Sequence, residues 1–264
     1  MKKHIPLLTL FTAIILLSGC SRPEKFIQDS EPNLPQVNAG CNEIAFFLDP
    51  SLGNGYKCET IPESNNPERP SYYVFIYPTH TEVSLQDYPL TQTQFPPQIW
   101  IYPIARFSEQ LPEIIPPLVS DLQSFISNGT SGDKKLPFLP TILEKQAFFA
   151  HEKGLSFNGG QGVRYITQYS EGPNPITNKN IIYTFQGLTD DGMYWVAVTL
   201  PISHPILPDE YTTLPEGYTE ESLILDYGAY TNDMKGRLSA ELPDSFSPPL
   251  DVLDFLVMSI TINN

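Results

Sequence analysis

Three closely spaced β-strand patterns in the middle of the chain constrain its fold more than any other feature. Residues 163–169 (VRYITQY), 181–187 (IIYTFQG) and 193–200 (MYWVAVTL) are rich in aromatic and β-branched side chains, which favour strands. Residues 189–192 (TDDG) suit a tight turn with glycine in the left-handed position. These segments therefore predict antiparallel strands, the last two of which form a hairpin.

The third of these strands is apolar on both of its faces. Because successive side chains of a strand point to opposite sides, Trp195 and Ala197 face one way and Val196 and Val198 the other. Strands of this kind are usually covered on both sides. We therefore expect helices or long loops to pack against each face of the sheet.

A strong helix pattern precedes the central strands. Apolar residues recur at intervals of three and four over residues 111–126, and Pro116 and Pro117 fit a helix only in its first turn. The helix is therefore predicted to begin near Pro116 and to end at Asn128 and Gly129.

Shorter elements are expected around this helix. Residues 72–77 (YYVFIY) and 99–104 (IWIYPI) are predicted to be strands, since they are β-branched and aromatic. The segment 136–143 (LPFLPTIL) is expected to pack irregularly because two prolines interrupt it. A short helix is predicted to follow over residues 143–150.

The C-terminal part predicts two more helices and a strand. Thr219 can cap a helix whose first turn holds two glutamates, and helical spacing continues to Leu238. Residues 247–249 (SPP) are predicted to begin a last helix. Residues 259–262 (SITI) are expected to form a closing strand.

The order of these elements predicts an α+β fold. We expect residues 41–264 to form a single domain, with an antiparallel sheet flanked by helices on both faces, which is an α/β/α sandwich. The chain has 27 prolines in 264 residues, twice the usual share of about 5%. Prolines throughout the chain argue against a long helical bundle.

The first residues have the layout of an export signal. Lys2 and Lys3 precede an apolar run over residues 5–17. This run is too short to cross a bilayer, which takes about 20 residues. We therefore predict a signal peptide over residues 1–19 and an extracytoplasmic location for the rest of the chain.

A cysteine directly follows the predicted signal peptide. Leu17, Ser18, Gly19 and Cys20 resemble the lipobox of bacterial lipoproteins, in which this cysteine receives a diacylglyceryl group and is then acylated at its new amino terminus. Two or more acyl chains hold a protein stably on a membrane. The resemblance predicts anchoring through Cys20 to the cell membrane or the outer membrane; an ordinary cleaved signal is the alternative.

Two cysteines remain for the folded part. Residues 20–40 are rich in proline and asparagine and are expected to form a flexible tether behind the lipidated cysteine. Cys41 and Cys58 then form an even pair in an oxidising compartment, which favours a disulfide. Two free thiols or a redox pair are the alternatives, although the spacing is far from C-x-x-C.

The charge restricts the partners. The formal net charge is −15, which opposes binding to nucleic acid or to bare anionic lipid. Solubility outside the cytoplasm is sufficient to explain the charge.

No catalytic or metal-binding motif is complete in the sequence. His80, His151 and His204 lack the spacing of a metal-binding helix, and Ser156 lacks the second glycine of G-x-S-x-G. Residues 159–162 (GGQG) precede a strand rather than a helix, so they suit a hairpin bend and not a phosphate site. We therefore expect no catalytic residue, no metal and no cofactor.

The aromatic residues of the central strands allow one candidate binding site. Tyr165, Tyr169, Tyr183 and Trp195 could line a ligand groove. Packing in the core and the sheet is the alternative that explains them better.

A resemblance covers roughly residues 99–208. The segments LPFLP (136–140), GQGVRYITQY (160–169), YTFQGLTDDGMYWVAVTLP (183–201) and HPILP (204–208) resemble a group of uncharacterised bacterial lipoproteins and secreted proteins. This group has no assigned activity, so the resemblance implies no catalytic residues. The order of elements is also similar to that of the PsbP-like α/β/α sandwich, which is an analogy of fold alone.

These features predict a non-enzymatic binding or accessory module of the cell envelope. Its expected partners are the bilayer, through Cys20, and an envelope protein or glycan, with no nucleic acid. One alternative is a hydrolase of an envelope polymer, which would need an acid/base pair such as His80 with Glu82. Another is solute capture for a transporter, which would need a cleft between two lobes.

Overall fold

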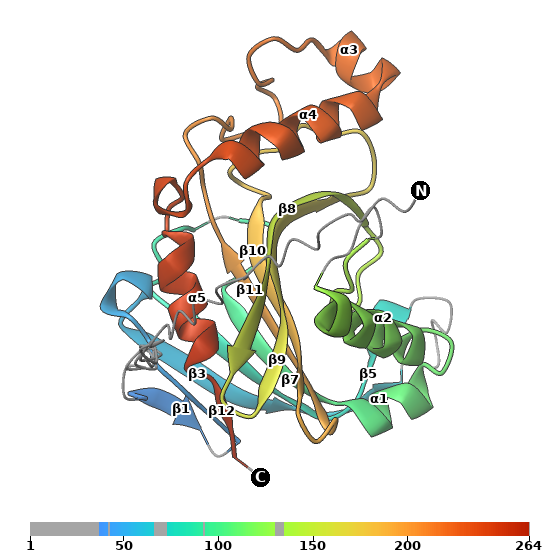
Figure 1. The fold of residues 1–264 in the computed structure, drawn as a ribbon, viewed down its shortest axis with the longest axis vertical. Helices are drawn as coiled ribbons and strands as arrows, with labels where there is room; N and C mark the ends of the chain where they lie inside the picture. The colour runs from blue at the N-terminus through green and yellow to red at the C-terminus, as the bar shows by residue number, and fades with distance from the viewer. Residues whose placement is uncertain (1–36, 42, 66–72, 92, 130–134, 264) are drawn as a thin grey trace, which may run out of the picture. The chain divides into compact units, whose positions relative to one another are not determined.

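The structure is a computed structural model that describes residues 37–41, 43–65, 73–91, 93–129 and 135–263 (Figure 1). The described residues pack as one unit. They form an α+β fold with mostly antiparallel sheets and a few helices. None of the helices in these ranges is long and apolar enough to cross a membrane.

The predicted anchor lies outside the described residues. This holds for the signal peptide, for Leu17, Ser18, Gly19 and Cys20, and for most of the predicted tether. Strand β1 (Ala39–Cys41) begins at the end of the tether segment.

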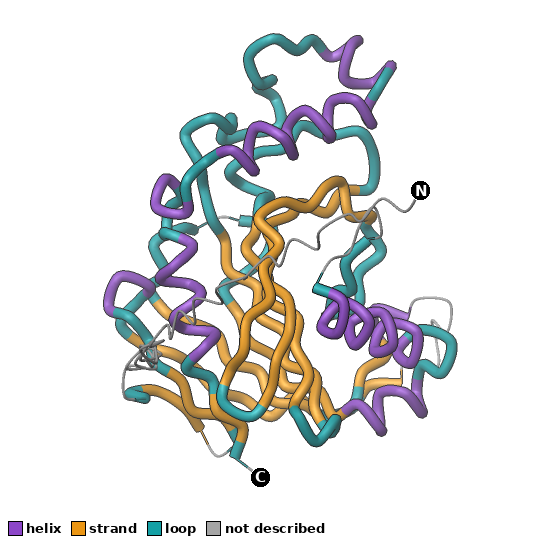
Figure 2. Tube along the Cα trace, viewed as in Figure 1, coloured by secondary structure: helices purple, strands orange, loops and turns teal. Residues whose placement is uncertain are grey.

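A seven-stranded antiparallel sheet forms the centre of the fold, and its strands run side by side (Figures 1 and 2). From one edge to the other they are β3 (Gly55–Ile61), β6 (His80–Gln86), β7 (Gln98–Pro103), β11 (Tyr194–Pro201), β10 (Ile182–Thr189), β9 (Gly160–Ser170) and β8 (Lys145–Phe157).

The three central strand predictions are confirmed by β9, β10 and β11. Leu188 pairs with Trp195 at the predicted hairpin, and Gly192 takes the left-handed conformation there with φ 70°. The glycine-rich segment before β9 forms the bend of the β8–β9 hairpin, where Gly159 has φ 88°. Local sequence pattern therefore determines this part of the sheet.

Short strands form two smaller sheets. β1 and β12 (Thr261–Ile262) pair on either side of β2 (Ile44–Phe46). β4 (Ser64–Asn65) pairs with β5 (Ile76–Tyr77). In the strand predicted over residues 72–77, Ile76–Tyr77 are strand β5, but Tyr73–Phe75 form a 3-10 turn, so the prediction is wrong for these three residues. Two further 3-10 turns are Pro50–Leu52 and Pro243–Ser245.

Most of the predicted helices are present, with two departures from the predictions. The described α-helices are α1 (Ile104–Gln110), α2 (Ile115–Asn128), α3 (Glu220–Leu225), α4 (Tyr227–Ala240) and α5 (Leu250–Met258). Helix α2 ends at Gly129 in the left-handed conformation, as predicted. The helix predicted over residues 143–150 is wrong, because these residues enter β8 and pair with β9.

Local hydrogen bonds from capping side chains explain where helices α3 and α4 of the C-terminal part begin. Thr219 caps α3 as predicted, in a capping box with Ser222. The side chain of Asp226 accepts a hydrogen bond of 2.9 Å from the Ala229 N–H and so begins α4. The single helix predicted from this pattern is therefore divided in two.

Apolar clusters lie on both sides of β11. Val196 and Val198 belong to a first cluster that includes Leu253 of α5 and Met234 of α4. Trp195 belongs to a second cluster with Phe107 of α1 and Leu122 and Phe125 of α2. The two-faced apolar pattern of β11 is thus explained by burial on each side.

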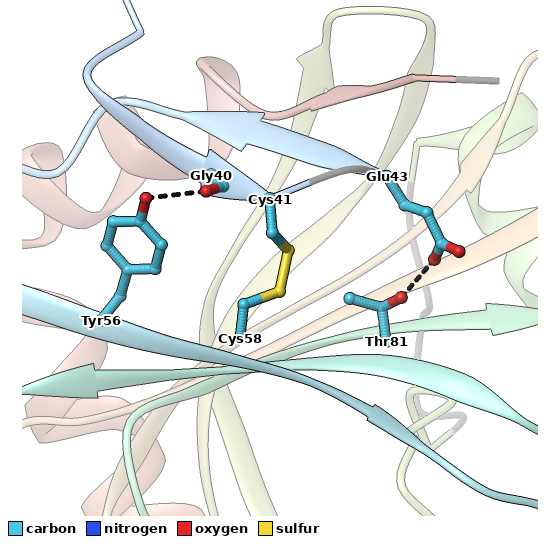
Figure 3. The surroundings of a disulfide bond; sticks show 6 residues. All are labelled: Gly40, Cys41, Glu43, Tyr56, Cys58 and Thr81. Carbon is cyan, nitrogen blue, oxygen red and sulfur yellow. Dashed lines mark hydrogen bonds between the residues drawn. A yellow bond between two sulfur atoms is a disulfide. The ribbon is translucent and has the colours of Figure 1, made fainter.

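The predicted disulfide between Cys41 and Cys58 is confirmed (Figure 3). It joins β1 to the edge strand β3 across a sequence separation of 17 residues. The Tyr56 hydroxyl of β3 donates to the Gly40 carbonyl of β1 at 2.7 Å and supports the same contact, and the Thr81 hydroxyl of β6 donates to Glu43, which lies between β1 and β2. The first strand is therefore held covalently against the central sheet.

Candidate functional site

The four aromatic residues of the predicted groove do not lie together. Tyr165 and Trp195 are buried in the second cluster, near α2, whereas Tyr183 is buried in the first cluster on the opposite face. Tyr169 lies in a third, small cluster with Phe95 and others. Of the four, Tyr169 also lines a cavity.

This cavity, which we call the α2 groove, is the best candidate site. Its volume is about 520 Å³, which is within the range of about 300–1,000 Å³ that is typical of small-ligand sites. It lies between the start of α2 and the segment 135–146. Its lining residues are Tyr73, Ile114, Leu118, Lys135, Leu136, Phe138, Thr141, Ile142, Leu143, Glu144, Lys145, Gln146 and Tyr169.

Buried polar side chains of the sheet hold one wall of the α2 groove in place. Both amide atoms of Gln186 bind the backbone of Leu139: Oε1 accepts from the N–H at 3.0 Å, and Nε2 donates to the carbonyl at 3.1 Å. The Tyr165 hydroxyl donates to the carbonyl of Pro137 at 2.9 Å. Trp195 Nε1 donates to Gln186 Oε1 at 2.8 Å. Two of the predicted groove aromatics therefore support the wall rather than line it.

The sequence of this wall suits its irregular path. Pro137 and Pro140 have no N–H, so the segment has fewer backbone donors to satisfy inside the protein. Gln186 and Tyr165 satisfy three of the polar groups of residues 137–139. Sequence reasoning found the apolar segment but missed Gln186, because its partner Leu139 lies 47 residues away.

Hydrogen bonds also fix the two ends of the α2 groove. At one end, Gln146 Oε1 accepts from the Leu136 N–H at 3.2 Å, and its Nε2 donates to the Tyr169 hydroxyl at 3.2 Å. Burial raises the pKa of Tyr169, so this phenol stays neutral. At the other end, the Tyr73 hydroxyl donates to the Ile142 carbonyl at 3.0 Å.

The acid/base pair considered from the sequence lies in a packed environment. The His80 ring stacks near Tyr102, with 4.5 Å between centroids, and its Nδ1 lies 2.8 Å from the Pro78 carbonyl. Glu82 accepts from Gln98 Nε2 at 2.6 Å and from Trp100 Nε1 at 3.1 Å. Both residues project from the same side of β6, but neither lines the α2 groove.

The structure brings together a serine, a histidine and a glutamate that the sequence did not connect. His204 Nε2 lies 2.9 Å from Ser245 Oγ and 3.5 Å from Glu241. A nucleophilic serine needs a histidine nitrogen that accepts its proton and an acid at the other ring nitrogen. Here His204 Nδ1 accepts from the Ile206 N–H at 3.3 Å, and Ser245 donates to the Leu242 carbonyl at 2.6 Å. The arrangement is a partly buried polar contact and lacks the geometry of a catalytic triad.

A buried ion pair provides the hydrogen-bond partner of the buried Tyr183 hydroxyl. Arg164 of β9 and Asp254 of α5 are each 4% exposed and form two hydrogen bonds of 2.9 Å. The Tyr183 hydroxyl and Lys153 Nζ each donate to Asp254 at 3.0 Å. Burial alone would raise the pKa of Asp254, but Arg164 and Lys153 together hold it below its usual value. In the described part of the chain, no group of three or more His, Cys, Asp or Glu is placed to hold a metal ion.

The stability of the protein is expected to fall as the pH drops below about 6.5. Burial lowers the pKa of His80, His151 and His204, so the unfolded chain takes up protons that the folded protein resists. Their contribution is fully present above the unfolded pKa and is lost as the pH falls through the folded values. Asp254 adds its own loss only below about pH 4.

Urea unfolding from about pH 8 to about pH 5 measures this effect. His204→Gln keeps a hydrogen-bonding side chain that does not titrate, and it is expected to flatten the slope. A free energy of unfolding that is constant or rises over this range would contradict the prediction.

Comparison with known proteins adds no relative: no family model matches the chain, and neither a curated protein nor a solved structure is found to match it.

Proposed function

We propose that the chain is a lipid-anchored, extracytoplasmic binding module without enzymatic activity, and that the α2 groove is its binding site. The observation that carries this proposal is the groove itself. It is a cavity of about 520 Å³, and eight of its thirteen lining residues are aliphatic or aromatic. Such a lining suits the binding of an apolar ligand or an apolar part of a partner.

Export and anchoring are supported by the sequence. The charged start, the short apolar run and the lipobox-like ending at Cys20 form one consistent signal. The disulfide between Cys41 and Cys58 agrees with this proposal, because disulfides persist mainly in oxidising compartments.

A binding function is favoured over the two alternatives, a hydrolase and a solute-capture protein, for two different reasons. His80 and Glu82, the pair considered for a hydrolase, are engaged by neighbouring residues away from the α2 groove. Solute capture between two lobes needs a second lobe, whereas the described residues pack as one unit.

We further propose that the layers form the α/β/α sandwich suggested by the PsbP-like analogy. In support, residues of α4 and α5 belong to one apolar cluster of the sheet and residues of α1 and α2 to the other. The relation to uncharacterised bacterial lipoproteins remains a proposal that rests on the segments quoted from the sequence.

Saturable binding of the neutral apolar dye N-phenylnaphthylamine tests the groove. The chain from residue 21 onward is suitable, because it lacks the predicted signal peptide and lipid site and keeps all of the described residues, which pack as one unit. We expect one dye per protein. Leu143→Arg is expected to weaken binding about tenfold or more, since Leu143 lines the groove and is 49% exposed.

Leu225→Arg is the matched control, because Leu225 is 77% exposed and does not line the groove. It should leave dye binding unchanged. Absence of saturable binding, or equal effects of the two substitutions, would contradict the proposed site. Circular dichroism of each variant checks that the fold is retained.

A further inference from the structure

We infer that the ligand of the α2 groove is a single-chain amphiphile with an anionic head group. The inference rests on the proposed function, because it names the ligand class of the same site. It follows from the way the groove combines an apolar wall with two lysines at one end.

The apolar part of the groove fits an alkyl chain. Ile114 and Leu118 contribute from α2, and Leu136, Phe138 and Ile142 contribute from the segment that follows it. None of these side chains offers a hydrogen bond, so they favour hydrocarbon over a polar chain. Each methylene group buried there is expected to strengthen binding about fourfold.

The two lysines lie at the same end of the groove. The Leu136 N–H donates to the side chain of Gln146 at 3.2 Å, so the two backbone segments are adjacent at this point. Lys135 and Lys145 immediately precede these two residues, line the groove and are exposed. Within the described ranges, no ion pair is formed by either lysine.

This end differs from the rest of the protein in its charge. The chain has 30 acidic and 15 basic residues, whereas the groove is lined by two lysines and one acid, Glu144. A local excess of positive charge on an acidic protein complements an anionic head group beside the apolar wall.

A single amphiphile fits better than the surface of a bilayer. The net charge of −15 repels an anionic membrane over most of the protein. A cavity of about 520 Å³ has the size of one small ligand. The structure therefore favours one chain with its carboxylate at the lysine end.

Calorimetric titration tests the inference, with dodecanoate and dodecylammonium below their micelle concentrations and dodecanol below its solubility limit. The protein is again the chain from residue 21 onward, without the apolar signal segment. Dodecanoate is expected to bind one to one and about tenfold more tightly than dodecanol, with dodecylammonium weakest.

Lys135→Glu combined with Lys145→Glu is expected to remove the preference for dodecanoate and to leave dodecanol binding within about twofold. Lys57→Glu combined with Lys179→Glu is the control: the same charge change is made at lysines that do not line the groove and whose side chains are 60% and 39% exposed, and no effect is expected.

Three results would overturn the inference. Equal binding of dodecanoate and dodecanol, or a preference that survives the double substitution, would leave the groove as a binding site but exclude the anionic ligand. Lysine-dependent binding to phosphatidylglycerol vesicles without binding of free dodecanoate would replace the single chain by a membrane surface. If neither the three amphiphiles nor N-phenylnaphthylamine bound to the protein, the proposed function would be refuted as well.

Discussion

Replacing Asp254 by alanine is expected to lower the free energy of unfolding by about 3–5 kcal/mol. The carboxylate of Asp254 accepts two hydrogen bonds from Arg164, one from Tyr183 and one from Lys153. Without it, the guanidinium of Arg164 stays buried with no counter-charge. The cost therefore comes mainly from the charge that remains, and urea unfolding at pH 7 measures it.

Two further variants separate the cost of an unpaired buried charge from the cost of lost packing. Asp254→Leu combined with Arg164→Met removes both charges and should cost clearly less than Asp254→Ala, because no buried charge is left unpaired. Lys153→Met should cost less than about 1 kcal/mol, since Lys153 is 51% exposed. If Asp254→Ala and the double variant were equally unstable, lost packing rather than charge would explain the effect.

Replacing Trp195 by alanine is expected to cost about 3–5 kcal/mol as well. Trp195 is fully buried in the second cluster, so its removal leaves a large cavity. It also removes the hydrogen bond that Trp195 donates to Gln186, and Gln186 holds the backbone of Leu139 in the wall of the α2 groove. We therefore expect weaker binding of N-phenylnaphthylamine in addition to the loss of stability measured by urea unfolding.

Trp195→Phe is the control for this prediction. It keeps most of the apolar contact and removes only the indole N–H, so a cost of about 1–2 kcal/mol is expected. A loss of less than about 1 kcal/mol for Trp195→Ala would show that the region is not part of the packed core.

The sequence predicted the elements whose patterns are local. The three strands from β9 to β11 follow from aromatic and β-branched runs, and the end of α2 follows from Gly129. The edge strand β3 and its neighbour β6 were not predicted, because GYKCETI and HTEVSLQ mix polar and apolar residues. They become strands through pairing with each other and, for β6, with β7.

The helix wrongly predicted over residues 143–150 shows most clearly that a local apolar pattern does not distinguish a helix from a strand. The run Ala147, Phe148, Phe149 and Ala150 has an apolar pattern that is compatible with a helix or a strand. Pairing with β9 decides in favour of a strand. Phe148 then joins the first cluster and Phe149 the second, as expected for successive residues of a strand between two apolar layers.

The candidate site depends on contacts that the sequence does not reveal. The sequence suggested that four aromatic residues share one groove. Tyr183, however, lies on the other face of the sheet, where its hydroxyl donates a hydrogen bond to Asp254. The α2 groove itself forms because Gln186 and Tyr165 hold residues 137–139 from a distance in the chain. Only the apolar character of residues 136–143 signalled this wall in advance.

Lipid attachment at Cys20 would place the binding module at a membrane surface, and the intact mass of the protein tests this most directly. The protein would be produced in a bacterium that processes lipoproteins and purified from its membranes. We expect a chain that lacks residues 1–19 and carries a diacylglyceryl group and an acyl group on Cys20, and we expect Cys20→Ser to abolish this mass. A mass that corresponds to the full chain, or to cleavage that leaves Cys20 without lipid, would contradict the proposed function.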